Sequence, residues 1–298
     1  MEYTEPKVIL LAETSVHREG LARYLDLAGA PEWETDTEIG SEVIAEIAGR
    51  SCYRSFKEGL NKNVTRVREG NESYLGNIAK QKHGSVFEHG SATLAFFDVS
   101  RIVTHELVRH RPGMAYSQES LRFVRLDALK MYYPRVFGVE FLKEVFDAID
   151  WSKVESVDPE KRETVDQLAW ARKTAKELNN LFRETVEQLE NVQLQLAEIT
   201  QIDHFKESKF HVKKALTSAF RRLAPEGLAT SIIVTGNHRS WRHVIQNRTS
   251  VGAEEEIRDA FWKAAQIMRD CFPHIYQDMI VGERVDGIPQ ITFENEKI

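Results

Sequence analysis

The sequence predicts a globular protein that mixes helices with strands. Apolar runs indicate short strands at 8–12, 93–99 and 230–235. Helical spacing of apolar residues indicates helices over 17–29, 41–55, 73–81, 100–110, 162–192 and 207–224, with another after Asn237. The chain has 298 residues, of which 42% are hydrophobic and 29% charged, which is typical of an ordinary globular protein. One or two domains are expected at this length.

Charge and composition exclude several classes of protein. The formal net charge of −6 argues against a general polyanion binder, so we expect no nucleic-acid partner. No apolar stretch approaches the roughly 20 residues of a membrane span, and Glu2, Glu5 and Lys7 interrupt any signal-peptide pattern, so we expect no membrane partner. Cys52 and Cys271 form no disulfide or metal pattern, so the sequence predicts a reduced, cytoplasmic setting.

The helix over 41–55 ends in a basic residue. Its apolar stripe consists of Val43, Ile44, Ile47 and Ala48. Arg50 near its end could serve the function or could be a solvated charge at a helix end. The sequence favours the solvated charge. A polar, loop-like segment follows over 57–72.

Two histidines and a carboxylate lie close together in the stretch His83-Gly84-Ser85-Val86-Phe87-Glu88-His89. This combination invites a metal site. Its spacing fits no standard zinc motif, and the stretch supplies no fourth ligand. We therefore predict no metal ion here.

The most informative stretch is basic and rich in polar residues, and it reads Arg109-His110-Arg111-Pro112-Gly113-Met114-Ala115-Tyr116-Ser117-Gln118-Glu119-Ser120-Leu121-Arg122. Ser100 is a good N-cap for the preceding helix, which would carry the arginines into a loop broken at Pro112-Gly113. Arginine forks match phosphate oxygens, and Ser, Gln and backbone N–H groups complete such a cradle. The sequence therefore predicts an anion-binding loop, and the alternative is a solvated basic turn.

The middle of the chain carries no recognisable chemistry. The long amphipathic helix would turn inward Val165, Leu168, Ala175, Leu178, Leu181, Val186 and Leu189. Its Glu, Lys and Gln residues are most simply a solvated face. The helix over 207–224 carries Arg221 and Arg222 into its last turn, where the helix dipole alone would explain them.

A second polar constellation follows the strand at 230–235 and spans 237–248. Asn237 can cap a helix whose apolar face contains Trp241, Val244 and Ile245. Its other faces carry Arg239, His243 and Arg248 without a balancing acid. The simplest interpretation is a second surface that faces an anion.

These motifs together resemble the flavin-dependent thymidylate synthases. The spacing of Arg109-His110-Arg111 from Ser120 and Arg122 is similar to that family's signature. Residues 83–89 resemble the family's flavin-contacting turn. Arg221 with Pro225 resembles its helix-ending arginine, and 237–248 resemble its C-terminal helix, which contacts flavin and substrate. The four blocks occur in the family's order, and the match covers about 41–125 and 210–270.

The resemblance implies an α+β fold, in which a mixed or antiparallel sheet is packed by long helices. It implies one domain over 1–298 with a mainly helical, family-divergent insertion at about 126–205. It also implies a homotetramer whose active sites are shared between subunits around FAD. The implied reaction is the reductive methylation of dUMP to dTMP, with 5,10-methylenetetrahydrofolate as carbon donor and NADPH as reductant.

The resemblance also assigns roles to individual residues. The implied FAD contacts are Ser85, Glu88, Arg109, His110, Arg111, Asn237, Arg239 and His243. The implied dUMP contacts are Glu106, Gln118, Ser120, Arg122, Arg221 and Arg248. Arg248 would act catalytically by stabilising negative charge on the uracil ring, and His83 would shape access near the flavin.

Some features of the sequence leave alternatives open. Ser120 could be a nucleophile, but no histidine base stands beside it in the sequence, so we interpret it as a phosphate ligand. The signature loop is one residue longer than is usual in the family, and Gly252 replaces a frequent histidine. Either change is compatible with FAD-dependent C5 modification of another pyrimidine nucleotide. A non-catalytic nucleotide- or RNA-binding homologue is a further alternative.

Overall fold

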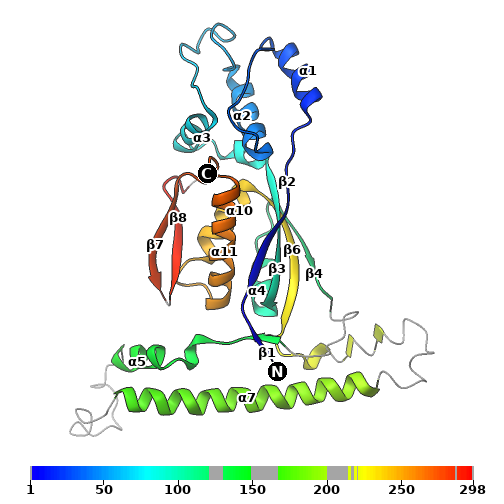
Figure 1. The fold of residues 1–298 in the computed structure, drawn as a ribbon, viewed down its shortest axis with the longest axis vertical. Helices are drawn as coiled ribbons and strands as arrows, with labels where there is room; N and C mark the ends of the chain where they lie inside the picture. The colour runs from blue at the N-terminus through cyan, green and yellow to red at the C-terminus, as the bar shows by residue number, and fades with distance from the viewer. Residues whose placement is uncertain are drawn as a thin grey trace. The chain divides into compact units, whose positions relative to one another are not determined.

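The computed structural model describes residues 2–120, 130–148, 167–199, 214–215, 218–219, 221–285 and 287–296. The chain forms two compact units, Met1–Glu5 with Ser120–Ala229 and Pro6–Glu119 with Thr230–Ile298. Both units contain helices and strands (Figure 1), so the predicted α+β class is confirmed. A single domain with an insertion at about 126–205 stays a prediction.

A four-stranded sheet forms the centre of the larger unit. Its strands, in spatial order, are β2 (Lys7–Glu13), β3 (Ser91–Ser100), β6 (Ala229–Asn237) and β4 (Met114–Gln118). The pairs β2–β3 and β4–β6 are antiparallel. The strands predicted at 8–12, 93–99 and 230–235 are thereby confirmed, whereas β4 falls in the stretch that was predicted to be a loop.

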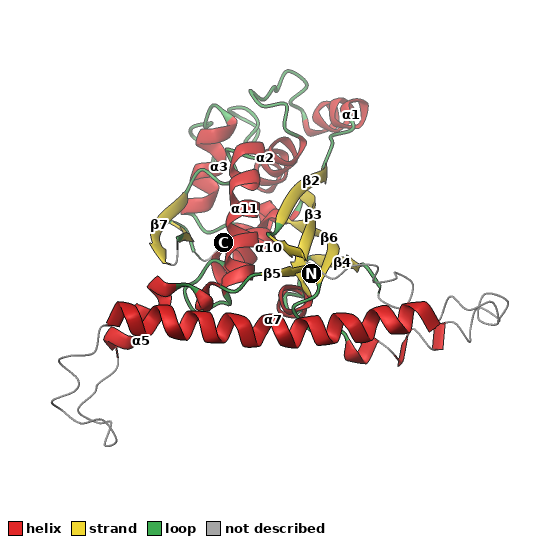
Figure 2. Cartoon of the chain, turned by 60° about the horizontal axis from the view of Figure 1, so that its bottom comes forward, coloured by secondary structure: helices red, strands yellow, loops and turns green. Residues whose placement is uncertain are grey.

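Helices and a hairpin complete the larger unit (Figure 2). The helices are α1 (Arg18–Ala28), α2 (Gly40–Tyr53), α3 (Asn71–Lys80), the 3-10 helix η1 (Gly84–Glu88), α4 (Arg101–Leu107), α10 (His238–Arg248) and α11 (Glu255–Cys271). The hairpin consists of β7 (Met279–Val285) and β8 (Ile288–Phe293). The helix predicted over 100–110 ends earlier than expected, at Leu107, so Arg109 and His110 lie beyond its end.

The core of this unit lies between the sheet and the C-terminal helices. The spacing of Trp241, Val244 and Ile245 places all three on one face of α10, as predicted, and all three are buried. The indole of Trp241 donates to the Ala92 carbonyl of β3 at 3.0 Å. Burial of this face fixes which residues of α10 remain available to a ligand, because the opposite face must point away from the core.

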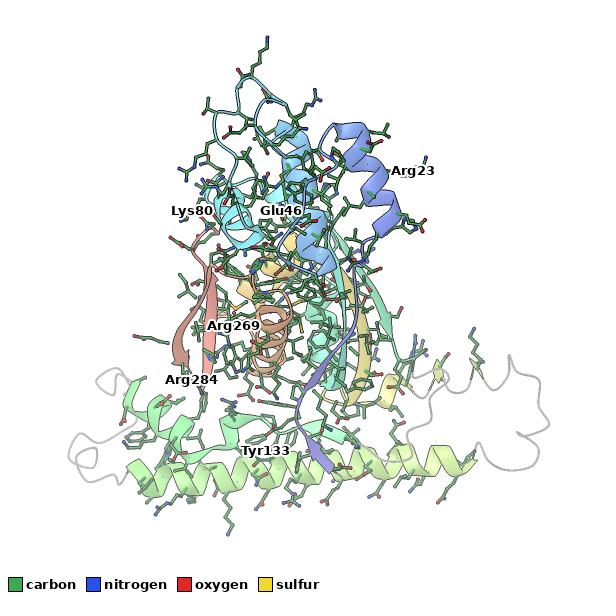
Figure 3. The ribbon with its side chains drawn as sticks, turned by 45° about the horizontal axis from the view of Figure 1, so that its top comes forward. Arg23, Glu46, Lys80, Tyr133, Arg269 and Arg284 are labelled. Carbon is green, nitrogen blue, oxygen red and sulfur yellow. The ribbon has the colours of Figure 1, made fainter. Side chains whose placement is uncertain are left out.

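Arg50 is buried, so the prediction of a solvated charge at a helix end is wrong. Its side chain is 3% exposed and lies 2.7 Å from the Glu46 carboxylate on the same helix. Its guanidinium also donates to the carbonyls of Ser55 and Arg68, each at 2.8 Å, and lies 4.3 Å from the Tyr74 ring centroid. Glu46 is labelled in Figure 3. The loop that follows α2 therefore closes over this arginine and satisfies it.

A second buried arginine, Arg242, joins α10 to the C-terminal segment. It forms a bidentate pair with Asp278, with N–O distances of 2.7 and 2.9 Å, and donates to the Ile275 carbonyl at 2.8 Å. The guanidinium also lies 4.0 Å from the ring centroid of Phe293. These contacts hold the pair in a buried site and, through hydrogen bonding and the nearby charge, keep the pKa of Asp278 below its usual range.

The described residues of the smaller unit include two paired strands and two packed helices. Its elements are β1 (Glu2–Thr4), β5 (Lys130–Tyr132), the 3-10 helix η2 (Arg135–Phe137), α5 (Val139–Ala148), α7 (Gln167–Ile199) and the 3-10 helix η4 (Arg221–Leu223). Strands β1 and β5 are parallel. Helix α5 packs against α7 through Leu142, Ala171 and Ala175. Tyr133, labelled in Figure 3, stacks edge-on against Tyr3 at 4.9 Å.

The long predicted helix is confirmed over the described residues 167–199, but its inward face was only partly predicted. Ala175 and Val186 are buried as expected. Leu168 and Leu181 are 39% and 63% exposed, because burial on α7 depends on which stretches α5 and η2 cover. Val165 and most of the predicted helix over 207–224 lie outside the described residues. Within the described part of the chain, no helix is long and apolar enough to cross a membrane.

Candidate functional site

The basic stretch begins where α4 ends. Ser100 caps α4 as predicted, because its hydroxyl accepts from the Val103 N–H at 3.3 Å. The Ser100 N–H itself donates to the buried Glu256 carboxylate of α11 at 2.6 Å. The N-terminal end of this short helix is therefore fixed, and the turn that carries Arg109 and His110 follows its last residue, Leu107.

The stretch that was predicted to be a loop continues as strand β4. Tyr116 pairs with Val234 of β6, so the partner that makes this segment a strand comes from far along the chain. The Tyr116 hydroxyl donates to the carbonyl of Leu107 at 3.1 Å and lies within hydrogen-bonding distance of the His110 carbonyl. Tyr116 thereby ties the turn after α4 to the sheet.

Helix α10 begins against the same turn. Asn237 caps it, as predicted, by accepting from the Ser240 N–H at 2.8 Å. The Ser240 hydroxyl donates to the Pro112 carbonyl at 2.9 Å, and the Asn237 N–H donates to the Gly113 carbonyl at 3.2 Å. Gly113 has a φ of 68°, and a Cβ added there would overlap the Ser240 hydroxyl. The first polar stretch, as far as Glu119, and the second, 237–248, are thus brought together.

A pocket of about 440 Å³ lies between these two segments and η1. The predicted FAD contacts that line it are Glu88, Arg109, His110, Asn237, Arg239 and His243. Glu88, the one carboxylate among the described residues that line it, pairs with Arg239. Arg109 is exposed at the pocket. The lining therefore combines cations with hydrogen-bonding amide and imidazole groups, a donor set that fits an anionic, hydrogen-bonding group such as the pyrophosphate of FAD.

Arg248 lies beside this pocket and is held on three sides. Its Nε donates to Nε2 of His110 at 2.7 Å. Its Nη1 donates to the Glu106 carboxylate at 2.6 Å, and its Nη2 donates to the Glu106 carbonyl at 2.9 Å. The side chain of Arg248 is 18% exposed, so the ion pair is partly shielded from water. The predicted nucleotide contacts Glu106 and Arg248 are therefore brought together with a residue of the predicted FAD set.

His110 is held as a neutral imidazole. Burial first, and then the nearby Arg248 and His243, lower the pKa of His110 to about 4. The ring of His243 packs edge-on against it, with 5.8 Å between centroids. An uncharged imidazole can accept the Nε–H of Arg248, whereas an imidazolium could not.

Three of the predicted residues near the flavin lie apart from this pocket. Ser85 and Arg111 are exposed and do not line it. His83 lines a different pocket, also of about 440 Å³, which shares no lining residue with the first. There its ring stacks on Tyr53 with 5.9 Å between centroids, and its Nδ1 is 3.3 Å from the Tyr53 hydroxyl.

The remaining predicted nucleotide contacts are only partly described. Gln118 lies on β4, and its amide nitrogen is buried without a hydrogen-bond partner among the described residues. Ser120 and Arg221 belong to the smaller unit, with Arg221 in η4, and Arg122 lies outside the described residues. The buried, unsatisfied donor on Gln118 favours a ligand or a further segment at this end of β4.

Sequence reasoning missed two tyrosines with polar roles in these sites. Tyr116 was named only as a member of the basic stretch and was given no role, although the alternation of Met114, Tyr116 and Gln118 is typical of a strand with one face inward. Tyr53, which stacks on His83, gave no signal in the sequence because its partner lies thirty residues further along the chain.

Comparisons with known proteins cover the segments that form this site. The family model described as thymidylate synthase complementing protein matches residues 35–274, which include every described site residue named above. A flavin-dependent thymidylate synthase from Mycobacteroides abscessus is 31% identical over 279 residues, covering 93% of this chain and 95% of the relative. A flavin-dependent thymidylate synthase from Corynebacterium glutamicum is 29% identical over 262 residues and covers 88% of each chain.

A solved structure shares the fold. The crystal structure of thymidylate synthase X from Helicobacter pylori with FAD and dUMP matches with a TM-score of 0.50 at 18% sequence identity. It covers 92% of this chain and 98% of that one. The family resemblance that was predicted from four short motifs is therefore confirmed over most of the chain. The chain belongs to the thymidylate synthase complementing protein family, whose relatives named here are flavin-dependent thymidylate synthases.

Proposed function

We propose that this protein catalyses the FAD-dependent reductive methylation of dUMP to dTMP. In this proposal 5,10-methylenetetrahydrofolate supplies the carbon and NADPH is the reductant. The family membership supports the reaction class, because relatives that cover most of the chain carry this activity in their names. The reaction requires one small volume that accepts a flavin pyrophosphate and a nucleotide phosphate beside a group that can stabilise charge on a uracil ring.

The single observation that carries the proposal is the arrangement of Arg248. Its guanidinium is bonded to His110, which lines the pocket that also contains Arg109 and Arg239. A cation in a fixed orientation therefore stands directly next to a pocket that suits an anionic cofactor. A protein that only retained a nucleotide would not need this fixed guanidinium outside the cofactor pocket.

Each residue then has a role that its chemistry can support. Arg109, Arg239 and Asn237 bind FAD, with the Glu88 carboxylate orienting Arg239. FAD, when bound, supplies the hydride and carbon transfer. Arg248 stabilises the negative charge that develops on the nitrogen and oxygen edge of uracil when C5 becomes nucleophilic.

The other predicted contacts complete the proposed nucleotide site. Gln118, Ser120, Arg122 and Arg221 bind dUMP, with Arg122 acting mainly at the phosphate. The unsatisfied amide of Gln118 supports this assignment. Ser120 acts here as a ligand and not as a nucleophile.

We further propose a cytoplasmic homotetramer with active sites shared between subunits. His83 and Arg109 line two pockets with no lining residue in common, although both residues belong to the larger unit. If both serve one flavin, different copies of the chain can supply them. Cys52 and Cys271 are free thiols, which suits a reducing compartment. Light scattering coupled to size-exclusion chromatography tests the tetramer.

An anaerobic assay with dUMP, methylenetetrahydrofolate and NADPH tests the function. The purified protein should show the absorption bands of oxidised flavin and should form dTMP only when all three substrates are present. Product from another pyrimidine nucleotide but not from dUMP would replace the assigned substrate. A colourless protein that neither binds FAD nor forms product would refute the enzyme and favour a nucleotide- or RNA-binding homologue.

A further inference from the structure

The guanidinium of Arg248 is oriented by two residues with different chemistry. Glu106 contacts the two terminal nitrogens through its carboxylate and its carbonyl, at 2.6 and 2.9 Å. His110 contacts the inner nitrogen, Nε, at 2.7 Å. The bond at Nε adds a third point of attachment, so it further restricts rotation of the guanidinium plane. The N–H groups that these bonds leave over then point in a fixed direction.

The hydrogen bond between Arg248 and His110 also determines which ring nitrogen of His110 carries the proton. The Nε of an arginine only donates, so Nε2 of His110 must be the acceptor. A neutral imidazole that accepts at Nε2 carries its proton on Nδ1. The low pKa of His110 agrees with this uncharged form.

The backbone of His110 is itself held in place. Its N–H donates to the Leu107 carbonyl at 3.1 Å, and its carbonyl is within hydrogen-bonding distance of the Tyr116 hydroxyl. The ring of His243 packs against the imidazole. The imidazole therefore sits on a braced turn and can impose an orientation on Arg248.

We propose that His110 is a positioning residue for Arg248. As the Nδ1–H tautomer it accepts the Nε–H of Arg248 and, together with Glu106, presents the remaining N–H groups of the guanidinium to the substrate. This role goes beyond the FAD contact that the family resemblance assigns to His110. The inference rests on the proposed function in one respect, which is that Arg248 serves the nucleotide.

Three substitutions of His110 separate positioning from cofactor binding. The amide oxygen of His110→Gln can occupy roughly the place of Nε2 and accept from Arg248, whereas His110→Asn is too short to do so. Because a small misplacement of a catalytic group can cost about a hundredfold, His110→Asn and His110→Ala should lower kcat for dTMP roughly ten- to a hundredfold. His110→Gln should stay within about threefold of the wild type. Because His110 also lines the FAD pocket, the rates are compared at saturating FAD. Any weakening of FAD binding should be smaller than the loss of kcat, and the KM for dUMP should change less than kcat.

A double substitution tests whether His110 acts through Arg248. If it does, adding His110→Ala to an Arg248→Lys protein should cost less than about threefold, because the positioned group is already gone. If His110 acts independently of Arg248, His110→Ala should lower kcat in the Arg248→Lys protein by the same factor as in the wild type. Equal defects in His110→Gln and His110→Ala, or loss of FAD that matches the loss of rate, would likewise overturn the proposal.

A spectroscopic test does not depend on turnover. In holoenzyme labelled with 15N-histidine, the resonances that disappear in His110→Gln should be those of a neutral ring protonated at Nδ1. The Arg248→Lys substitution should weaken that tautomer preference. A proton on Nε2, or a doubly protonated ring at neutral pH, refutes the positioning role even if the wild type forms dTMP. Conversely, the wild type could show the predicted tautomer and yet form no dTMP. That result would support the hydrogen bond between His110 and Arg248 and would overturn only the proposed function.

Discussion

Replacing Arg248 with lysine removes the shape of the cation but keeps its charge. The arginine makes three hydrogen bonds of 2.6–2.9 Å in three directions, two to Glu106 and one to His110. A lysine ammonium is a compact point charge that cannot reproduce this planar fork. Lysine can keep the ion pair with Glu106, but the oriented N–H groups that we assign to the uracil are lost.

The expected magnitude follows from the role of a fixed donor in a partly shielded site. Arg248 is 18% exposed, so its field is less screened than that of a surface charge. Removing one donor that stabilises charge in a transition state costs about 3 kcal/mol, which corresponds to roughly a hundredfold in rate. Binding of dUMP should change less, because the charge develops only during the reaction. We therefore expect Arg248→Lys to lose dTMP formation while its FAD content and NADPH oxidation remain.

A single-turnover assay with reduced enzyme, dUMP and methylenetetrahydrofolate measures this step directly. Arg269→Lys is the matched control, because Arg269 lies on α11 at 45% exposure and forms only a loose pair with Asp270 at 3.7 Å. It is labelled in Figure 3. The control should behave as the wild type. Near-normal dTMP formation by Arg248→Lys would show that the guanidinium fork is not required, and another residue would have to face the uracil.

Three further predictions follow from the structure. Arg109→Ala should weaken FAD binding roughly ten- to a hundredfold in a flavin titration, because one charge-assisted contact contributes about 1.5–3 kcal/mol; unchanged affinity would remove Arg109 from the FAD site. Arg50→Met should lower the free energy of unfolding in urea by about 3–5 kcal/mol, because Glu46 is left buried without its partner, and adding Glu46→Leu should restore much of that loss. Burial raises the pKa of Glu256 from 4.5 to about 7, so as pH rises the unfolded chain loses the Glu256 proton at a lower pH than the folded protein does. The free energy of unfolding of the wild type should therefore fall as pH rises from about 4.5 to about 7. Glu256→Gln should lack that fall, and parallel stability–pH curves for the two proteins would contradict the assignment.

The local sequence determined those elements whose patterns depend only on residues that are close together in the chain. Strand β3 and helix α10 follow from runs of apolar residues and from helical spacing. The caps Ser100 and Asn237 bond N–H groups only three residues away, so the sequence is enough to identify both. The basic and hydrogen-bonding character of the two polar stretches was equally visible, because it depends on residue type, and their binding of an anion stays a prediction. Family motifs then identified the cofactor and the reaction class.

Tertiary structure decided everything that depends on a distant partner. The stretch expected to be a loop became β4 because β6 pairs with it from more than a hundred residues away. Arg50 is buried because later carbonyls and the Tyr74 ring close over it, which no pattern around position 50 reveals. The contact between Arg248 and His110 joins residues 138 positions apart, and burial of His110 beside that arginine leaves it an uncharged hydrogen-bond acceptor. The sequence specifies which side chain stands at a position. Its burial and its hydrogen-bond partners, which exist only in the folded chain, then determine its charge and its orientation.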